Sequence, residues 1–174
     1  RSSDLFFVVS AVGQAMAGFG VDRFGALRIL LAGISCFVLA GLGLAMATSS
    51  SALYAVAALA GLGNTVFHPA DFTVLNRHVS PPRLGHAFSV HGLSGNLGWA
   101  AAPLFLTGLA TLVGWRVAAA STIFVAIPAM LLLWHNRALL DTGHHAHAAK
   151  QSGHGTFDFM RVGAVWLCFA FFFL

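Results

Sequence analysis

Five apolar segments, each close to the length of a membrane-spanning helix, decide what this chain can fold into. A helix needs roughly 20 apolar residues to cross about 30 Å of hydrocarbon. Segments of this kind run over residues 5–21, 29–47, 53–75, 85–112 and 115–134. A sixth starts at Val162 and reaches the last residue while still too short to cross. The pattern therefore predicts five membrane-spanning helices and the start of another.

The composition supports a lipid environment. Of 174 residues, 58% are hydrophobic and 8% are charged, whereas soluble domains carry roughly 25% charged residues. So few charges cannot cover a surface that faces water. The segments are also longer than the ~10-residue strands of a membrane β-barrel. We therefore predict an all-α, polytopic membrane helix bundle, with the lipid bilayer as a partner and no nucleic acid, despite a net charge of +4.

The basic residues are distributed unevenly between the two sides of the predicted bundle. Alternate connections lie on opposite sides of a membrane, and the side richer in Lys and Arg is cytoplasmic. One side receives only Arg1 and Arg116. The other receives seven basic residues, namely Arg23, Arg28, Arg77, Arg83, Arg137, Lys150 and Arg161. The richer side is therefore predicted to be cytoplasmic, together with the long polar stretch 135–160.

The chain divides into three predicted parts. Residues 1–134 hold the five spans, 135–160 form a His-rich linker, and 161–174 begin a further helix. The first residue is Arg1 rather than Met, and the last apolar segment stops short. We expect a fragment of a longer protein, inactive by itself.

A charged turn joins the first two apolar segments, and its glycines and charged residues have a characteristic spacing. Gly18, Asp22, Arg23 and Gly25 fit the pattern G-x-x-x-D-R-x-G, and Arg28 follows. Gly18 permits close approach of another helix, and Gly25 permits a turn that a residue with Cβ would resist. The acid suits a helix N-terminus or an Arg, and the arginines suit headgroups. The simpler alternative is an ordinary basic turn with one acidic residue.

This turn resembles the signature loop of the major facilitator superfamily, between its second and third helices. "GWR", residues 114–116, is also similar to the start of that family's sixth helix. The resemblance covers the whole chain as helices two to six and the start of seven, an incomplete N-terminal half. It implies secondary active transport of a small solute by alternating access, ion- or proton-coupled, by a monomer in a bacterial inner membrane. It also implies that the loop latches the two halves of the transporter.

Some positions depart from the family pattern. Ala26 and Leu27 stand where basic residues usually follow the loop, and Ala57 and Ala60 replace the Arg and Gln of a second signature. A proton-coupling arginine therefore cannot be transferred to this chain. The stretches "GLGNTVFHPADFTVLNR" and "HGLSGNLGWAAAP" resemble the fosmidomycin-resistance-like branch of the family.

The third apolar segment carries the strongest candidates for a substrate or proton path. Asn64, His68 and Asp71 recur at i, i+4 and i+7, which predicts one helix face. Pro69 cannot donate a hydrogen bond to the carbonyl of Thr65, so a kink is predicted there. Ionisable residues inside a membrane are costly and are functional candidates by default.

Two roles stay open for Asp71. It could form a titratable pair with His68 in the cavity, relaying a proton or meeting a cationic group of the substrate. It could instead pair structurally with Arg23 or Arg28 of the charged turn. Weaker candidates for the path are His91 and Asn96 in the fourth segment, and Gln14 in the first. The fourth segment also carries a strip of glycines, which predicts close packing against another helix.

Two other function classes compete with transport. "GLSG" matches the sequence around the nucleophile of rhomboid-type proteases, which would make Ser94 catalytic. However, the next histidine is His135, outside the pattern such enzymes need. A non-transporting membrane fragment is the second alternative. The main prediction is a non-enzyme without catalytic residues.

The linker histidines invite a metal interpretation, because imidazoles bind zinc, nickel or copper. The surrounding Ala, Gly and Ser residues predict a solvated linker instead. We therefore predict no cofactor and no structural metal at this cluster, which comprises His144, His145, His147 and His154.

Overall fold

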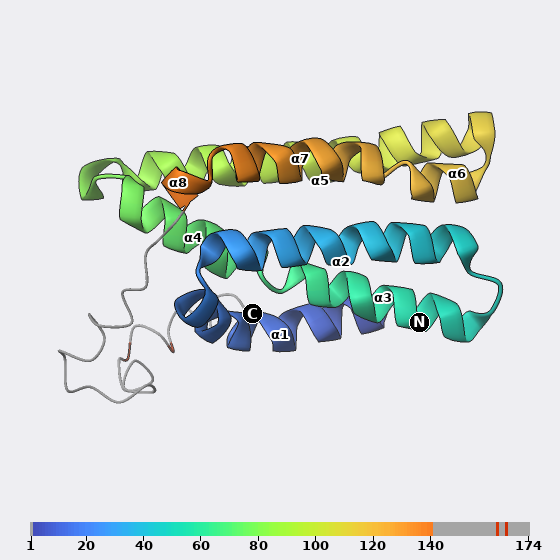
Figure 1. Ribbon diagram of the computed structural model, residues 1–174, viewed down its shortest axis with the longest axis horizontal. Helices are drawn as coiled ribbons and strands as arrows, with labels where there is room; N and C mark the ends of the chain where they lie inside the picture. The colour runs from blue at the N-terminus through green and yellow to red at the C-terminus, as the bar shows by residue number, and fades with distance from the viewer. Residues whose placement is uncertain (1, 141–162, 164–165, 167–174) are drawn as a thin grey trace. The chain divides into compact units, whose positions relative to one another are not determined.

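The computed structural model describes residues 2–140, 163 and 166, and everything below concerns the first of these ranges. This range falls within one compact unit. The described part is helical, with no β-strand. Its elements are α1 (Ser2–Phe24), α2 (Ala26–Met46), α3 (Ser50–Asn64), α4 (Phe67–His78), the short 3-10 helix η1 (Pro81–Arg83), α5 (Leu84–Val113), α6 (Trp115–Ala120), α7 (Ile123–His135) and α8 (Arg137–Leu140) (Figure 1).

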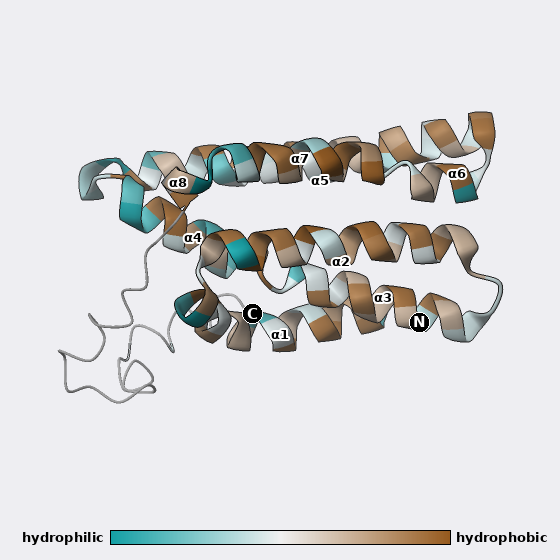
Figure 2. Ribbon diagram, viewed as in Figure 1, coloured by the Kyte–Doolittle hydropathy of each residue, from teal (hydrophilic) through white to brown (hydrophobic). Residues whose placement is uncertain are grey.

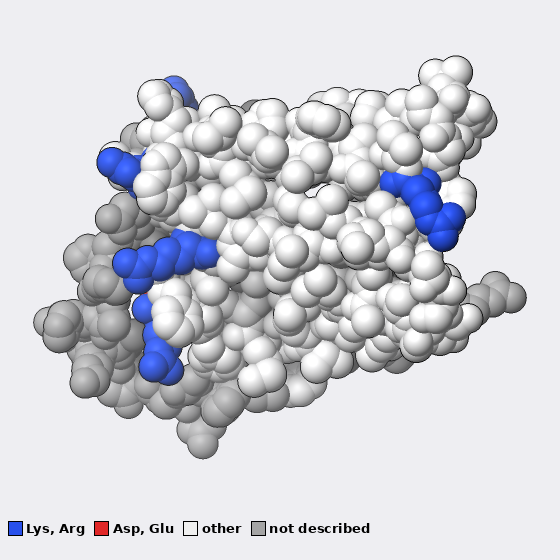
Figure 3. Space-filling view, turned by 45° about the vertical axis from the view of Figure 1, so that its right-hand side comes forward, with Lys and Arg blue, Asp and Glu red and all other residues white. Residues whose placement is uncertain are grey.

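Five helical stretches are long and apolar enough to cross a membrane, as predicted. They are Ser2–Phe24, Ala26–Met46, Ser50–His78, Pro81–Val113 and Trp115–His135. Hydrophobic colours dominate α2 and α7, and hydrophilic ones gather near α8 and the end of α4 (Figure 2). In the face shown in Figure 3, Lys and Arg side chains lie near the two ends, with a wide uncharged band between them. The predicted sixth segment lies outside the described residues.

Two glycines make the sharp connections between helices. Gly25, between α1 and α2, has φ 83°, and Gly114, between α5 and α6, has φ 87°. This left-handed region is open to glycine at little cost and strained for most other residues. The turn role predicted for Gly25 is confirmed.

The third span is broken where Pro69 predicts a kink. α3 ends at Asn64 and α4 begins at Phe67. Pro69 has no N–H to donate to the carbonyl of Thr65, so the helical ladder cannot continue through this point. The Thr65 hydroxyl donates instead to the carbonyl of Leu62 at 2.7 Å, which tightens the turn before the break.

The fifth span contains a second break, which the sequence analysis missed. α6 ends at Ala120 and α7 begins at Ile123. Ser121 and Thr122 donate their hydroxyls to the carbonyls of Ala118 and Ala119, at 2.7 and 2.8 Å. These side-chain bonds compete with the regular helical ladder at the break.

Glycines hold α1, α2 and α3 close together. A Cβ on Gly61 of α3 would lie 2.6 Å from the backbone oxygen of Phe6 in α1. A Cβ on Gly63 would lie 2.8 Å from the backbone oxygen of Gly33 in α2. Contacts this short leave no room for a side chain, so the three helices meet backbone to backbone. Gly13 faces Thr65 at the break of the third span.

The long helix α5 is packed differently. None of its residues is buried. Gly92, Gly95 and Gly98 have no atom within 4 Å of a built Cβ in the described part of the chain. The close packing predicted for this glycine strip is therefore not seen among the described residues.

Candidate functional site: an Asp–His pair between α4 and α5

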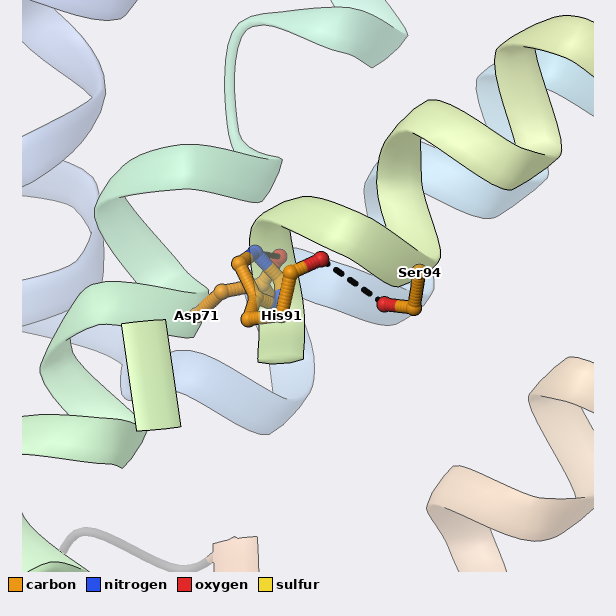
Figure 4. A network of polar contacts seen from close by, with 3 residues as sticks. All are labelled: Asp71, His91 and Ser94. Atoms are coloured by element: carbon orange, nitrogen blue, oxygen red, sulfur yellow. Dashed lines mark hydrogen bonds and ion pairs between the residues drawn. The ribbon is translucent and has the colours of Figure 1, made fainter. Parts of the chain in front are cut away.

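An intramembrane ion pair joins α4 to α5. The Oδ2 atom of Asp71 lies 3.5 Å from Nε2 of His91 (Figure 4). The side chains are a quarter and a third exposed, respectively. Both residues lie within helices long and apolar enough to cross a membrane. A carboxylate at this depth is costly unless it is paired or wetted, so the contact meets a physical need.

His91, one member of the pair, lines a cavity of about 510 Å³. Aromatic rings form much of its wall: the Phe72 ring lies 5.1 Å from Phe88 and 5.7 Å from the His68 ring, centroid to centroid. Polar groups come from two imidazoles and one amide. The lining residues are His68, Phe72, Phe88, His91, Gly92, Gly95, Asn96 and Trp99. An apolar hollow with a few convergent polar groups is typical of small-molecule sites.

The cavity unites candidates that the sequence analysis placed on separate helices. His68, His91 and Asn96 all line it. Asp71, however, pairs with His91 instead of the predicted His68, and in the described chain it forms no ion pair with Arg23 or Arg28. Spacing along one helix could not reveal a partner on the next helix.

Asn64 occupies different surroundings. Its Nδ2 donates to the Ser10 hydroxyl of α1 at 2.7 Å, and Gln14 Nε2 donates to the same oxygen at 3.4 Å. The helix break between Asn64 and His68 explains why the predicted common face is not kept. Ser10, 4% exposed, is the link that sequence reasoning missed. Its only signal is a position one turn before Gln14.

The charged turn lies at the end of the bundle where α1 meets α2. Arg23 rests over the Phe24 ring at 5.3 Å, and Asp22 and Arg28 are exposed. Gly18, expected to admit a close neighbour, has nothing within 4 Å among the described residues. The latch role of the charged turn stays a prediction.

Neither rival chemistry gains support from the described residues. The Ser94 hydroxyl donates to the backbone oxygen of His91 at 2.7 Å, and no imidazole is recorded as its partner in residues 2–140 (Figure 4). The described range also contains no group of three or more His, Cys, Asp or Glu side chains placed to hold a metal. The linker histidines lie outside that range.

The five apolar spans of the described residues define an integral, multi-pass helical membrane protein, with a largely apolar cavity that carries a few polar groups between two of the spans. Residues 3–174 match the model of the Major Facilitator Superfamily. The chain belongs to this superfamily of membrane transporters, as its charged turn predicted.

The chain is similar to several curated proteins, two of which are named as MFS-type transporters. The chain is 38% identical over 100 residues to the fosmidomycin resistance protein of Escherichia coli, covering 57% of this chain and 24% of that protein. It is 32% identical over 100 residues to a multidrug resistance protein B homolog of Mycobacterium tuberculosis, covering 58% and 18%. An uncharacterized MFS-type transporter of Bacillus subtilis, YfnC, is 31% identical over 127 residues, covering 73% and 31%. The matches therefore span less than a third of each relative.

Proposed function

We propose that this chain is part of a secondary transporter that moves a small solute by alternating access, with the α4–α5 cavity on the solute path. The observation that carries the proposal is the Asp71–His91 pair, which links two spans at the edge of a cavity. Transporter sites lie near the bilayer midplane, where ionisable groups mark ion and substrate routes. Rocking of two halves requires more of the protein than these residues.

We propose that the pair couples transport to protons. An imidazole titrates near neutral pH, and a proton gained by Asp71 would remove its attraction for His91. The titratable groups that act on Asp71 are His91 and His68. One proton taken from water on one side, and returned on the other, would alternately release and restore the contact between α4 and α5.

The proposed membrane and orientation follow from the distribution of basic residues and from the similar bacterial proteins. Bacterial relatives and the excess of basic residues on one side support a bacterial inner membrane with residues 135–160 in the cytoplasm. The same proposal includes a monomeric state and a division of the chain into residues 1–134, 135–160 and 161–174. It also includes a latch formed by the signature loop, whose residues are Gly18, Asp22, Arg23, Gly25 and Arg28.

Proton movement driven by a solute gradient tests the function. The intact protein is reconstituted in vesicles that contain a pH-sensitive dye, and a panel of small solutes including fosmidomycin is added outside. A solute that changes the internal pH only when the protein is present identifies coupled transport. No such solute across a broad panel, with protein shown to be folded, would contradict the proposal.

Matched variants then test the pair. Asp71→Asn and His91→Gln are expected to abolish solute-driven proton movement, because each removes one titratable partner. His86→Gln is the control, since His86 is an exposed histidine on α5 outside the cavity. Loss of coupling in all three variants, or in none, would remove Asp71 and His91 from the mechanism.

A further inference from the structure

A second cavity, of about 570 Å³, lies where α1 turns into α2 and α7 leads into α8. It contains charged residues that the proposed solute path does not use. Its lining consists of Asp22, Phe24, Gly25, Leu27, Arg28, Leu31, Trp134, Arg137, Ala138 and Leu140. We propose that this cavity binds the phosphate headgroup of an anionic phospholipid. The proposal does not depend on the transport function.

The depth of the cavity fits a lipid headgroup. Arg28 lies near the beginning of the span Ala26–Met46, and Trp134 near the end of the span Trp115–His135. Tryptophan concentrates where hydrocarbon meets headgroups, and basic residues concentrate just outside it. Both side chains are exposed, so lipid can reach them from the side of the bundle.

The charge of the lining favours an anion. The lining contains two guanidiniums, of Arg28 and Arg137, and one carboxylate, of Asp22. Neither arginine forms an ion pair with another described residue, whereas Arg137 rests over the Trp134 ring at 5.1 Å. Stacking leaves the guanidinium edge free to donate, and planar guanidinium groups bind phosphate oxygens in pairs. The lining therefore offers two phosphate-binding groups.

The apolar part of the lining distinguishes a lipid from a free ion. Leu27, Leu31 and Leu140 stand beside the arginines in the same cavity. A phosphate ion gains nothing from these side chains, but the glycerol and first acyl carbons of a phospholipid bury apolar surface against them. Basic pockets between spans on the cytoplasmic side are suited to anionic lipid heads.

Native mass spectrometry of the intact protein in detergent measures the affinity directly. Phosphatidylglycerol is titrated against the protein, with phosphatidylcholine and inorganic phosphate as separate arms. The wild-type protein is expected to retain phosphatidylglycerol in preference to phosphatidylcholine. Displacement by an equal concentration of inorganic phosphate would show a site for the free ion and overturn the lipid proposal.

Charge variants test both the direction and the size of the expected change in lipid affinity. Arg28→Gln and Arg137→Gln are each expected to weaken phosphatidylglycerol binding about fivefold. Asp22→Asn is expected to strengthen it by a similar factor, so the proposal does not rest on variants that fail by unfolding. Arg83→Gln, on η1 and outside the cavity, is the matched control and should leave the affinity within about twofold. Equal loss with Arg83→Gln, or no change in the three cavity variants, would overturn the site.

Discussion

The glycines of α1, α2 and α3 are closed in by neighbouring helices, whereas those of α5 are open. A Cβ on Gly61 would lie 2.6 Å from the Phe6 backbone oxygen, while one on Gly95 meets no described atom within 4 Å. The same residue type therefore has two consequences. In the first region it permits backbone contact between spans, and in the second it leaves space that forms part of a cavity.

The polar groups of the two regions differ in the same way. Asn64 of α3 donates a hydrogen bond to the buried Ser10 of α1, which also accepts one from Gln14 of its own helix. Asp71 and His91 remain partly exposed beside the cavity. Satisfied, enclosed groups stabilise an interface, whereas accessible titratable groups can exchange protons and meet a ligand. The comparison separates a packing region from a proposed working region.

The largest expected effect on stability comes from adding one methyl group to a closed glycine. Gly61→Ala is expected to lower the free energy of unfolding by about 1–3 kcal/mol, because helices α1 and α3 must separate to admit Cβ. Gly95→Ala is the matched control, and it should be neutral or stabilising by up to about 1 kcal/mol. Thermal unfolding in detergent measures both. Equal losses would erase the proposed difference between the regions.

A smaller effect is expected from the enclosed hydrogen bonds. Ser10→Ala removes the shared partner of Asn64 and Gln14 and should destabilise the protein by about 1 kcal/mol, a usual value between membrane helices. Ser94→Ala removes only a bond to the backbone of its own helix. It should change the melting temperature much less. A larger shift for Ser94→Ala than for Ser10→Ala would contradict the assignment of the packing region.

The smallest stability change is expected at the ion pair itself. Asp71→Asn should alter the free energy of unfolding by less than about 1 kcal/mol, since polar contacts between membrane helices contribute about 0.6 kcal/mol on average. The same variant is expected to abolish proton-coupled transport. This split between stability and activity distinguishes a working pair from a structural one. Unfolding as strong as that of Gly61→Ala would show that Asp71 mainly holds the fold together.

The sequence predicted the spans better than their interruptions. Long apolar segments located all five described helical stretches, and Pro69 located the break at Thr65. The break at Ser121 was missed, because local hydroxyl bonds to Ala118 and Ala119 leave no distinctive spacing. Family resemblance rested mainly on the charged turn, whose four matching residues lie within eight consecutive positions.

The site was predicted only in part, for a geometric reason. Spacing along one helix grouped Asn64, His68 and Asp71, but the break directs Asn64 towards Ser10. The partner of Asp71, His91, lies on the following span, and one sequence carries no signal of contact between spans. Residue type identified the candidates, and packing decided which of them meet.

Water access along α5 tests the central claim most directly. Single cysteines replace Gly95, which lines the cavity, and Leu97, which lies two residues further and therefore about 200° around the helix. The intact protein, with its other cysteines removed, is labelled in membranes with N-ethylmaleimide, which needs a hydrated thiolate. Our account predicts labelling at Gly95→Cys at least about tenfold faster than at Leu97→Cys. Equal rates, or faster labelling at Leu97→Cys, would contradict a solute path between α4 and α5.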